Sequence, residues 1–112
     1  MTSVKIYKSG GDIIKLEAQG HAGYGVYGED VVCAGISSII QTAMLGLMQV
    51  VQINAEIKRD EEANLMVISL PSNIPEDKFH EAQIVLKTMF CGLADLREGF
   101  SDFIELEVID NV

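Results

Sequence analysis

The chain has 112 residues and a formal net charge of −9 at pH 7. Apolar residues make up 48% of it and charged residues 22%, which excludes a disordered chain and fits a single domain over residues 1–112. The negative charge excludes direct nucleic-acid binding through an overall basic surface and favours cationic partners instead.

Two β-strands joined by a tight turn are predicted at the start of the chain. Apolar and polar residues alternate over residues 4–8 and again over residues 14–19, and the Ser-Gly-Gly-Asp sequence at residues 9–12 is typical of a hairpin turn. The second strand is expected to end near His21. Strand alternation places His21 in phase with polar positions, away from the core, unless a twist or bulge at Gly20 redirects it.

The segment Gly20–Ser37 then leads into a long apolar helix, and its eighteen residues contain one histidine, one cysteine and five glycines. Asp30 is the predicted N-cap of this helix. Apolar residues with helical spacing follow it, namely Ile36, Ile39, Ile40, Ala43, Met44, Leu47 and Met48. With this start, Cys33 is the third helical residue and lies in the first turn.

No charged residue occurs between Val31 and Ala55, a stretch long enough to span a bilayer. Polar residues interrupt it, however, and no basic cluster flanks either end, so we favour a buried helix of a soluble domain and expect no membrane association. The polar residues are Ser37, Ser38, Gln41, Thr42, Gln49, Gln52 and Asn54. The helix has more apolar residues than one sheet face needs, which makes a homodimer plausible.

The remaining chain predicts two strands, a helix and a last strand. The strands cover residues 56–60 and 65–70, and the helix opens at residues 73–76 with a cap-type Asn, an early Pro and a Glu. Gly99 is a natural stop, and residues 104–108 alternate as a strand. The order ββαββαβ predicts an α+β fold, a mainly antiparallel sheet with two helices packed on one face.

Cys33 and His21 are the candidate catalytic residues. Exposed N–H groups and the helix dipole favour a thiolate in the first turn of a helix, and a histidine that reaches the sulfur completes a nucleophile–base pair. As base it takes the thiol proton, and as acid it protonates the leaving amine. Without such a contact, a cysteine in an apolar helix is a small buried hydrophobe and a lone histidine is structural or solvated.

Three further residues are possible supporting groups. Asp30 either orients the imidazole of His21 or simply caps the helix, and capping is the commoner role. Ser37 lies four residues after Cys33 on the same helix face, where it either hydrogen-bonds near the site or only packs. The amides of the first turn, with that of Ala34, are placed to hold a developing oxyanion.

The glycines also match the pattern G-x-G-x-x-G over residues 23–28. A dinucleotide site is disfavoured, because the helix does not start within the motif, the acids just before the helix would repel phosphate, and no Gly-Lys-Ser/Thr follows. We expect instead a mobile substrate loop, in which the tyrosines are either contact residues or merely exposed. The loop residues are Gly23, Tyr24, Gly25, Tyr27 and Gly28.

No cofactor and no metal are expected. His21, Asp30 and Cys33 offer three ligands without a clear fourth, because His80 and Cys91 fall in the distant second helix. Two cysteines in different helices make no disulfide framework, and with no signal peptide a cytoplasmic location is the default. We assign no chemistry to Cys91 and expect His80 to be solvated.

The residues Gly20-His21-Ala22 and the run from Gly28 to Ser37, with the sequence GEDVVCAGIS, resemble the signature of the ribosomal-processing cysteine protease family Prp. That family has G-H-A, a short glycine-rich loop and then G-x-D-[IV]-V-C-A-[AG]-x-S. The length and the ββαββαβ order also agree, whereas the chain beyond Leu70 supports the match only through its pattern. Val31, where isoleucine is frequent, is a mild departure.

The resemblance implies a homodimeric bacterial cysteine endopeptidase with a His21–Cys33 dyad. It also implies a substrate, a large-subunit ribosomal protein precursor that is cut after an aromatic pair just before its basic mature start, with the glycine loop as a substrate-gated lid. The main alternative is a non-catalytic dimeric binding module for a ribosomal or other cationic protein. A structural dimer with a buried Cys33 is the third possibility.

Overall fold

The structure, a computed structural model, describes residues 1–20 and 27–112, and for residues 27–30 only the backbone. Its elements in chain order are β1 (Thr2–Ser9), β2 (Asp12–Gln19), α1 (Tyr27–Leu45), the π-helical turn η1 (Gly46–Val51), β3 (Glu56–Asp60), β4 (Leu65–Ser69), α2 (Glu76–Gly99) and β5 (Ile104–Ile109). This order confirms the predicted ββαββαβ arrangement and the α+β class.

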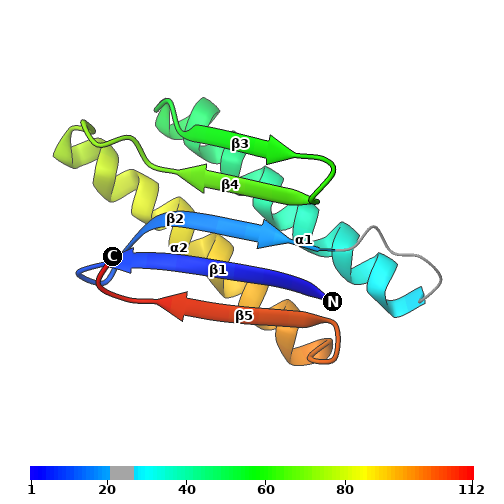
Figure 1. Ribbon diagram of the computed structural model, residues 1–112. Helices are drawn as coiled ribbons and strands as arrows, with labels where there is room; N and C mark the ends of the chain where they lie inside the picture. The colour runs from blue at the N-terminus through cyan, green and yellow to red at the C-terminus, as the bar shows by residue number, and fades with distance from the viewer. Residues whose placement is uncertain (21–26) are drawn as a thin grey trace.

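The five strands form one mixed sheet in the order β3-β4-β2-β1-β5 (Figure 1). The neighbours β1–β2, β2–β4 and β3–β4 are antiparallel, whereas β1–β5 is parallel. Ser3 pairs with Gln19, so the start of β1 lies beside the end of β2. This register brings Thr2 next to Gly20, the last described residue before α1.

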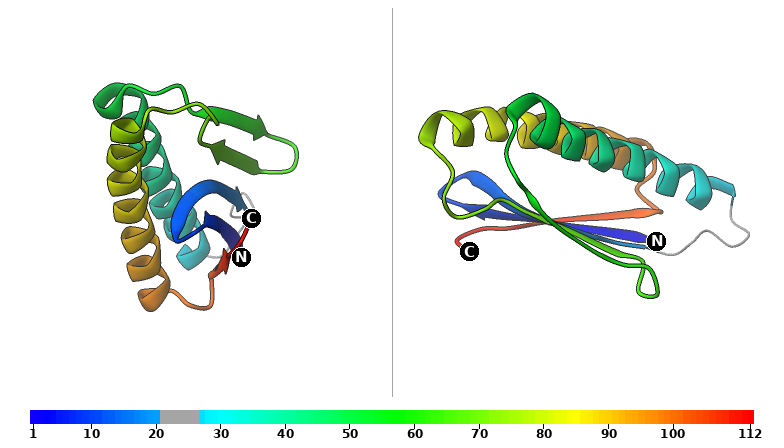
Figure 2. Two further views of the ribbon diagram at one scale, coloured as in Figure 1. Left: turned by 90° about the vertical axis from the view of Figure 1, so that its left-hand side faces the viewer. Right: turned by 90° about the horizontal axis from the view of Figure 1, so that it is seen from above.

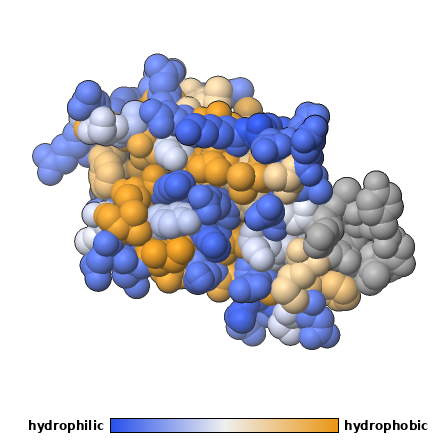
Figure 3. Space-filling model, viewed as in Figure 1, coloured by the Kyte–Doolittle hydropathy of each residue, from blue (hydrophilic) through white to orange (hydrophobic). Residues whose placement is uncertain are grey.

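Both helices cover the same face of the sheet (Figure 2). The core between the two layers consists of alternate strand residues and one side of each helix, as the periodicity predicts. Its largest fully buried side chains are Ile6, Ile13, Leu16, Ile40, Leu47, Leu93, Val4 and Val32. The other face of the sheet is open and carries a mixture of hydrophilic and apolar side chains (Figure 3).

The hairpin turn between β1 and β2 depends on two glycines. Gly10 and Gly11 have φ angles of 58° and 87°, values that side chains with a Cβ rarely adopt. Two consecutive residues with positive φ match the twist of the flanking strands, so this turn forms where the sequence predicts it.

Both helices start at other residues than the capping signals predict. α1 begins at Tyr27, three residues before Asp30, so the prediction that Asp30 is the N-cap is wrong. The backbone of Glu29 and Asp30 instead lies within the first turn of the helix. α2 begins at Glu76 with extended Pro75 at the N-cap position and no side-chain cap. The proline keeps the preceding residue extended, so Asn73 is too far from the helix to cap it.

Buried Gln83 on α2 binds the main chain of β2. Its Oε1 accepts from the Ile13 N–H at 2.8 Å, and its Nε2 donates to the Ile13 carbonyl at 2.7 Å. Ile13 is at an irregularity of the β1–β2 ladder, where the register shifts between Tyr7 and Lys8. The glutamine thus satisfies two backbone groups inside the core.

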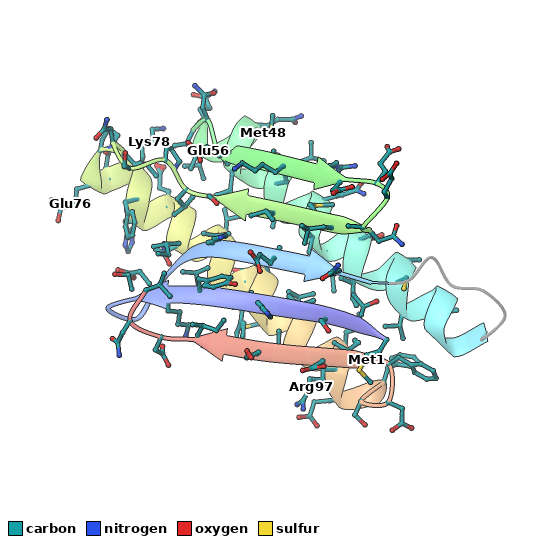
Figure 4. The ribbon with its side chains drawn as sticks, in the orientation of Figure 1. Met1, Met48, Glu56, Glu76, Lys78 and Arg97 are labelled. Atoms are coloured by element: carbon teal, nitrogen blue, oxygen red, sulfur yellow. The ribbon has the colours of Figure 1, made fainter. Side chains whose placement is uncertain are left out.

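The segment Val31–Val51 is apolar and long enough to cross a membrane by length and composition alone. Here it packs on the sheet through buried residues that include Val32, Ile40 and Leu47. After η1, Gln52 is left-handed with a φ of 64° and ends the helical segment. Lys78 Nζ donates to the Val51 carbonyl at 2.8 Å and fastens this end to α2, at the same end of the molecule as Met48 and Glu56 (Figure 4).

Candidate active site

Cys33 lies on α1 beside a pocket of about 300 Å³. Cys33 is half-buried in the single chain. The pocket is walled by the first half of α1, the end of β2, the start of β1 and the β3–β4 hairpin. Its described lining residues are Thr2, Ala18, Gln19, Gly20, Cys33, Ile36, Ser37, Ile40, Arg59, Asp60, Glu61, Asn64, Leu65 and Met66.

The Cys33 sulfur contacts a hydroxyl from a distant part of the chain. Thr2 Oγ1 lies 3.2 Å from Cys33 Sγ, within hydrogen-bond distance for sulfur, and either atom can be the donor. Thr2 is buried, with 5% of its surface exposed. The start of β1 therefore holds the thiol from the sheet side of the pocket.

The start of α1 changes the predicted environment of Cys33. Since α1 begins at Tyr27, Cys33 is its seventh residue and Ala34 its eighth, not members of the first turn. Amides at these positions bond to carbonyls four residues earlier. The first-turn position of Cys33 is therefore wrong for this structure, whereas the oxyanion role of the Ala34 amide stays a prediction. In the structure, the Thr2 hydroxyl makes a polar contact with the Cys33 sulfur.

The β3–β4 hairpin supplies the charged wall of the pocket. Arg59, Asp60 and Glu61 are exposed and line it together with Asn64. The hairpin is tied to the end of β2, because Gly20 N–H donates to the Asn64 carbonyl at 3.2 Å and Gln19 Nε2 donates to the Ala63 carbonyl at 3.3 Å. These bonds fix the position of the hairpin turn, which places one guanidinium and two carboxylates at the rim of the pocket.

The other predicted site residues are only partly described. Ser37 lines the pocket one turn after Cys33, as the spacing predicts, and its side chain is exposed. Tyr27, Gly28 and Asp30 belong to α1, and the structure gives their backbone only. His21, Gly23, Tyr24 and Gly25 lie outside the described residues, so the dyad stays a prediction.

The second histidine and the second cysteine lie away from the pocket. His80 and Cys91 are both exposed on α2, in agreement with a solvated histidine and a cysteine off the apolar stripe. Within residues 1–20 and 27–112, no three His, Cys, Asp or Glu side chains gather into a group that fits a metal ion.

A thiol that borders an open pocket on a rigid helix is the minimum site of a cysteine-dependent enzyme. The chain belongs to the cysteine protease Prp family, whose family model matches residues 1–105. It is therefore a cysteine-type endopeptidase.

Curated relatives agree with this assignment. The ribosomal processing cysteine protease Prp of Staphylococcus aureus is 28% identical over 97 residues, which cover 86% of this chain and 87% of the relative. The Prp of Bacillus subtilis is 22% identical over 100 residues, covering 89% and 88% of the two chains.

Solved structures share the fold over nearly the whole chain. A Streptococcus mutans protein superposes with a TM-score of 0.88 at 25% identity and covers 98% of this chain and 95% of its own. The S. aureus Prp in complex with a substrate peptide has a TM-score of 0.85 at 26% identity, with coverages of 96% and 99%. A second S. aureus complex holds a covalently linked product peptide, with a TM-score of 0.81, 27% identity and the same coverages.

Sequence reasoning missed two parts of the pocket. The alternation of β1 puts Thr2 in phase with buried Val4 and Ile6, so a buried hydroxyl was detectable, but its contact with Cys33 was not. The wall made by Arg59 to Glu61 carried no local signal, because it depends on how the hairpin pairs with β2.

Proposed function

We propose that the chain is an endopeptidase that removes the N-terminal extension of a large-subunit ribosomal protein precursor, with Cys33 as nucleophile and His21 as general base and acid. The observation that carries the proposal is the position of the Cys33 thiol at the pocket in a member of the Prp family. The name of the curated relatives, ribosomal processing cysteine protease, supports the substrate class.

The proposed reaction has two steps. His21 takes the Cys33 proton, the sulfur bonds to the carbonyl carbon of the scissile peptide, and the C–N bond breaks as His21 returns the proton to the leaving amine. Water, deprotonated by the same imidazole, then hydrolyses the thioester and regenerates the thiol. A covalently linked product peptide, as held by the S. aureus Prp, is the type of species that such a thiol pathway produces.

The lining of the pocket suits a peptide that is apolar on one side of the cut and basic on the other. Ala18, Ile36, Ile40 and Met66 line the pocket with apolar surface that suits aromatic side chains. Asp60 and Glu61 at the rim suit lysine and arginine side chains. The net charge of −9 adds long-range attraction for a basic protein.

The test is mass spectrometry of the extended ribosomal-protein precursor after incubation with the wild type, Cys33→Ala and His21→Ala. We expect one cut at the extension boundary by the wild type and a loss of at least 10³-fold in either variant. The chain offers matched controls in Cys91→Ala and His80→Ala, which remove the same side chains from exposed positions on α2 and should cleave at the wild-type rate.

The outcomes separate the hypotheses. A wild type that binds the precursor without cutting it would favour the non-catalytic binding module. A Cys33→Ala variant that still cuts would refute the nucleophile, and a His21→Ala variant that cuts normally would refute the base. A wild type that neither cuts nor binds would refute the substrate.

We also propose that the enzyme is a cytoplasmic homodimer that pairs through the outer face of its helices. A groove of about 540 Å³ lies between α1 and α2, lined largely by apolar residues such as Ile39, Ile84 and Met89. Leu45, Met48, Val50 and Ile84 are exposed on these helical segments. Apolar surface of this kind is buried at the interfaces of homodimers.

A further inference from the structure

The Thr2 side chain occupies a narrow space between two segments that the proposed reaction uses. Its hydroxyl lies 3.2 Å from Cys33 Sγ. On its other side is Gly20, where an added Cβ would lie 2.6 Å from Thr2 Oγ1 and 3.0 Å from its Cγ2. Gly20 immediately precedes His21, so Thr2 lies beside both Cys33 and the residue before the proposed base.

The backbone holds Thr2 in this place. Its N–H donates to the Phe103 carbonyl at 2.9 Å, and it pairs with Ile104 at the start of β5. With 5% of its surface exposed, the residue has little room for another rotamer. In Figure 4 the start of β1, marked by Met1, lies at the same end of the molecule as Arg97 near the end of α2.

We propose that Thr2 is a positioning residue for the nucleophile, whose hydroxyl donates a hydrogen bond to the Cys33 thiolate and holds the sulfur at the pocket. This inference rests on the proposed role of Cys33. In the thiol state either group donates, but a thiolate only accepts, so ionisation fixes the hydroxyl as donor. A hydrogen bond to an ionised acceptor is about twice as strong as a neutral one, and the contact therefore favours the thiolate.

The test compares Thr2→Val, which keeps the side-chain shape and removes the hydroxyl, with Thr2→Ser, which keeps the hydroxyl. The readout is the alkylation rate of Cys33 with iodoacetamide from pH 5 to 10, quantified by peptide mass spectrometry. Exposed Cys91 in the same samples is the internal reference.

For Thr2→Val we expect Cys33 alkylation to be roughly tenfold slower at neutral pH and to converge with the wild-type rate at high pH. Thr2→Ser should restore most of the wild-type profile. Precursor cleavage should fall in the same order at neutral pH. The Cys91 profile should not move in any variant.

The charged neighbours stay constant across these variants. Arg59, Asp60 and Glu61 face the same pocket from β3 and its turn, and Asp30 and the proposed base His21 keep their identities. A shift in the profile is therefore assigned to the hydroxyl. Gly20→Ala is a second variant, which keeps the hydroxyl but displaces it by crowding, and the same direction of shift is expected.

An unchanged pH profile in Thr2→Val would overturn the proposal. A loss that is equal at every pH would also overturn it, because that result indicates structural damage. The failure of the proposed function is distinguishable: if the wild type does not cut the precursor but the alkylation profile still shifts, Thr2 positions a thiol that serves another reaction.

Discussion

Replacing Gln83 by leucine tests whether the contact between α2 and β2 stabilises the fold. Gln83 is 5% exposed and makes two hydrogen bonds with the Ile13 main chain, at 2.8 and 2.7 Å. Leucine keeps a similar volume but leaves the Ile13 N–H and carbonyl without these partners. The substitution therefore removes hydrogen bonds without creating a cavity in the core.

The expected magnitude follows from the two backbone groups that lose their partner. Each buried group left unsatisfied costs about 1–3 kcal/mol. The apolar leucine side chain recovers part of this in the core, so we expect a net loss of about 3 kcal/mol in the free energy of unfolding. For a domain of this size that corresponds to a fall in Tm of roughly 10 °C or more.

Urea unfolding followed by circular dichroism measures the loss, at a fixed protein concentration because any dimer would couple to stability. Gln41→Leu on the exposed side of α1 is the matched control, and its unfolding midpoint should change little. Gln83→Glu keeps one acceptor but points a charge at the Ile13 carbonyl, so its defect should shrink as the pH is lowered toward about 4. Equal midpoints for Gln83→Leu and Gln41→Leu would refute the reasoning.

Two further predictions concern the open sheet face and the helical face. The Tyr7 hydroxyl donates to Glu17 Oε2 at 2.8 Å, which lowers the pKa of Glu17 and raises that of Tyr7. Because the pKa of Glu17 is lowered in the folded state, the pair stabilises the fold above the unfolded-state pKa of about 4.3 and loses this contribution as the pH falls through the folded-state pKa. Glu17→Gln should therefore flatten the acid side of the plot of unfolding free energy against pH, by less than about 1 kcal/mol. An unchanged plot would contradict this prediction. The Ile84 side chain is 57% exposed and lines the groove between α1 and α2. Ile84→Glu should convert the proposed dimer to a monomer in sedimentation velocity and leave the circular dichroism spectrum unchanged. A monomeric wild type or a dimeric variant would reject this interface.

Those strands and helices were predictable from the sequence whose apolar residues follow one clear period, either strand alternation or helical spacing. Strand alternation identifies Val4 and Ile6 as core residues, and both are buried. Helical spacing does the same for Ile36 and Ile40. Met48 is an exception, since it is 48% exposed although it continues the spacing. It lies in the π-helical turn η1, whose wider turn is not encoded in a 3.6-residue period.

Helix starts and the pocket were less predictable, for two different reasons. Aspartate is favoured both at the N-cap and in the first turn of a helix, so Asp30 alone does not determine at which residue α1 begins. The pocket depends instead on tertiary pairing. Thr2 and Cys33 are 31 residues apart in sequence and meet only when α1 packs against the sheet.

The arrangement separates the proposed nucleophile from the proposed specificity surface. Cys33 is fixed by α1 and by Thr2 of a central strand, both of which contribute to the core. Asp60 and Glu61 lie at the exposed end of a hairpin whose outer strand, β3, is at the edge of the sheet. We therefore expect charge-changing substitutions of the exposed Asp60 and Glu61 side chains to alter the charge at the pocket rim without displacing the thiol. Substitutions next to Cys33 are expected to affect stability as well, because the residues that place the sulfur also pack the helix against the sheet.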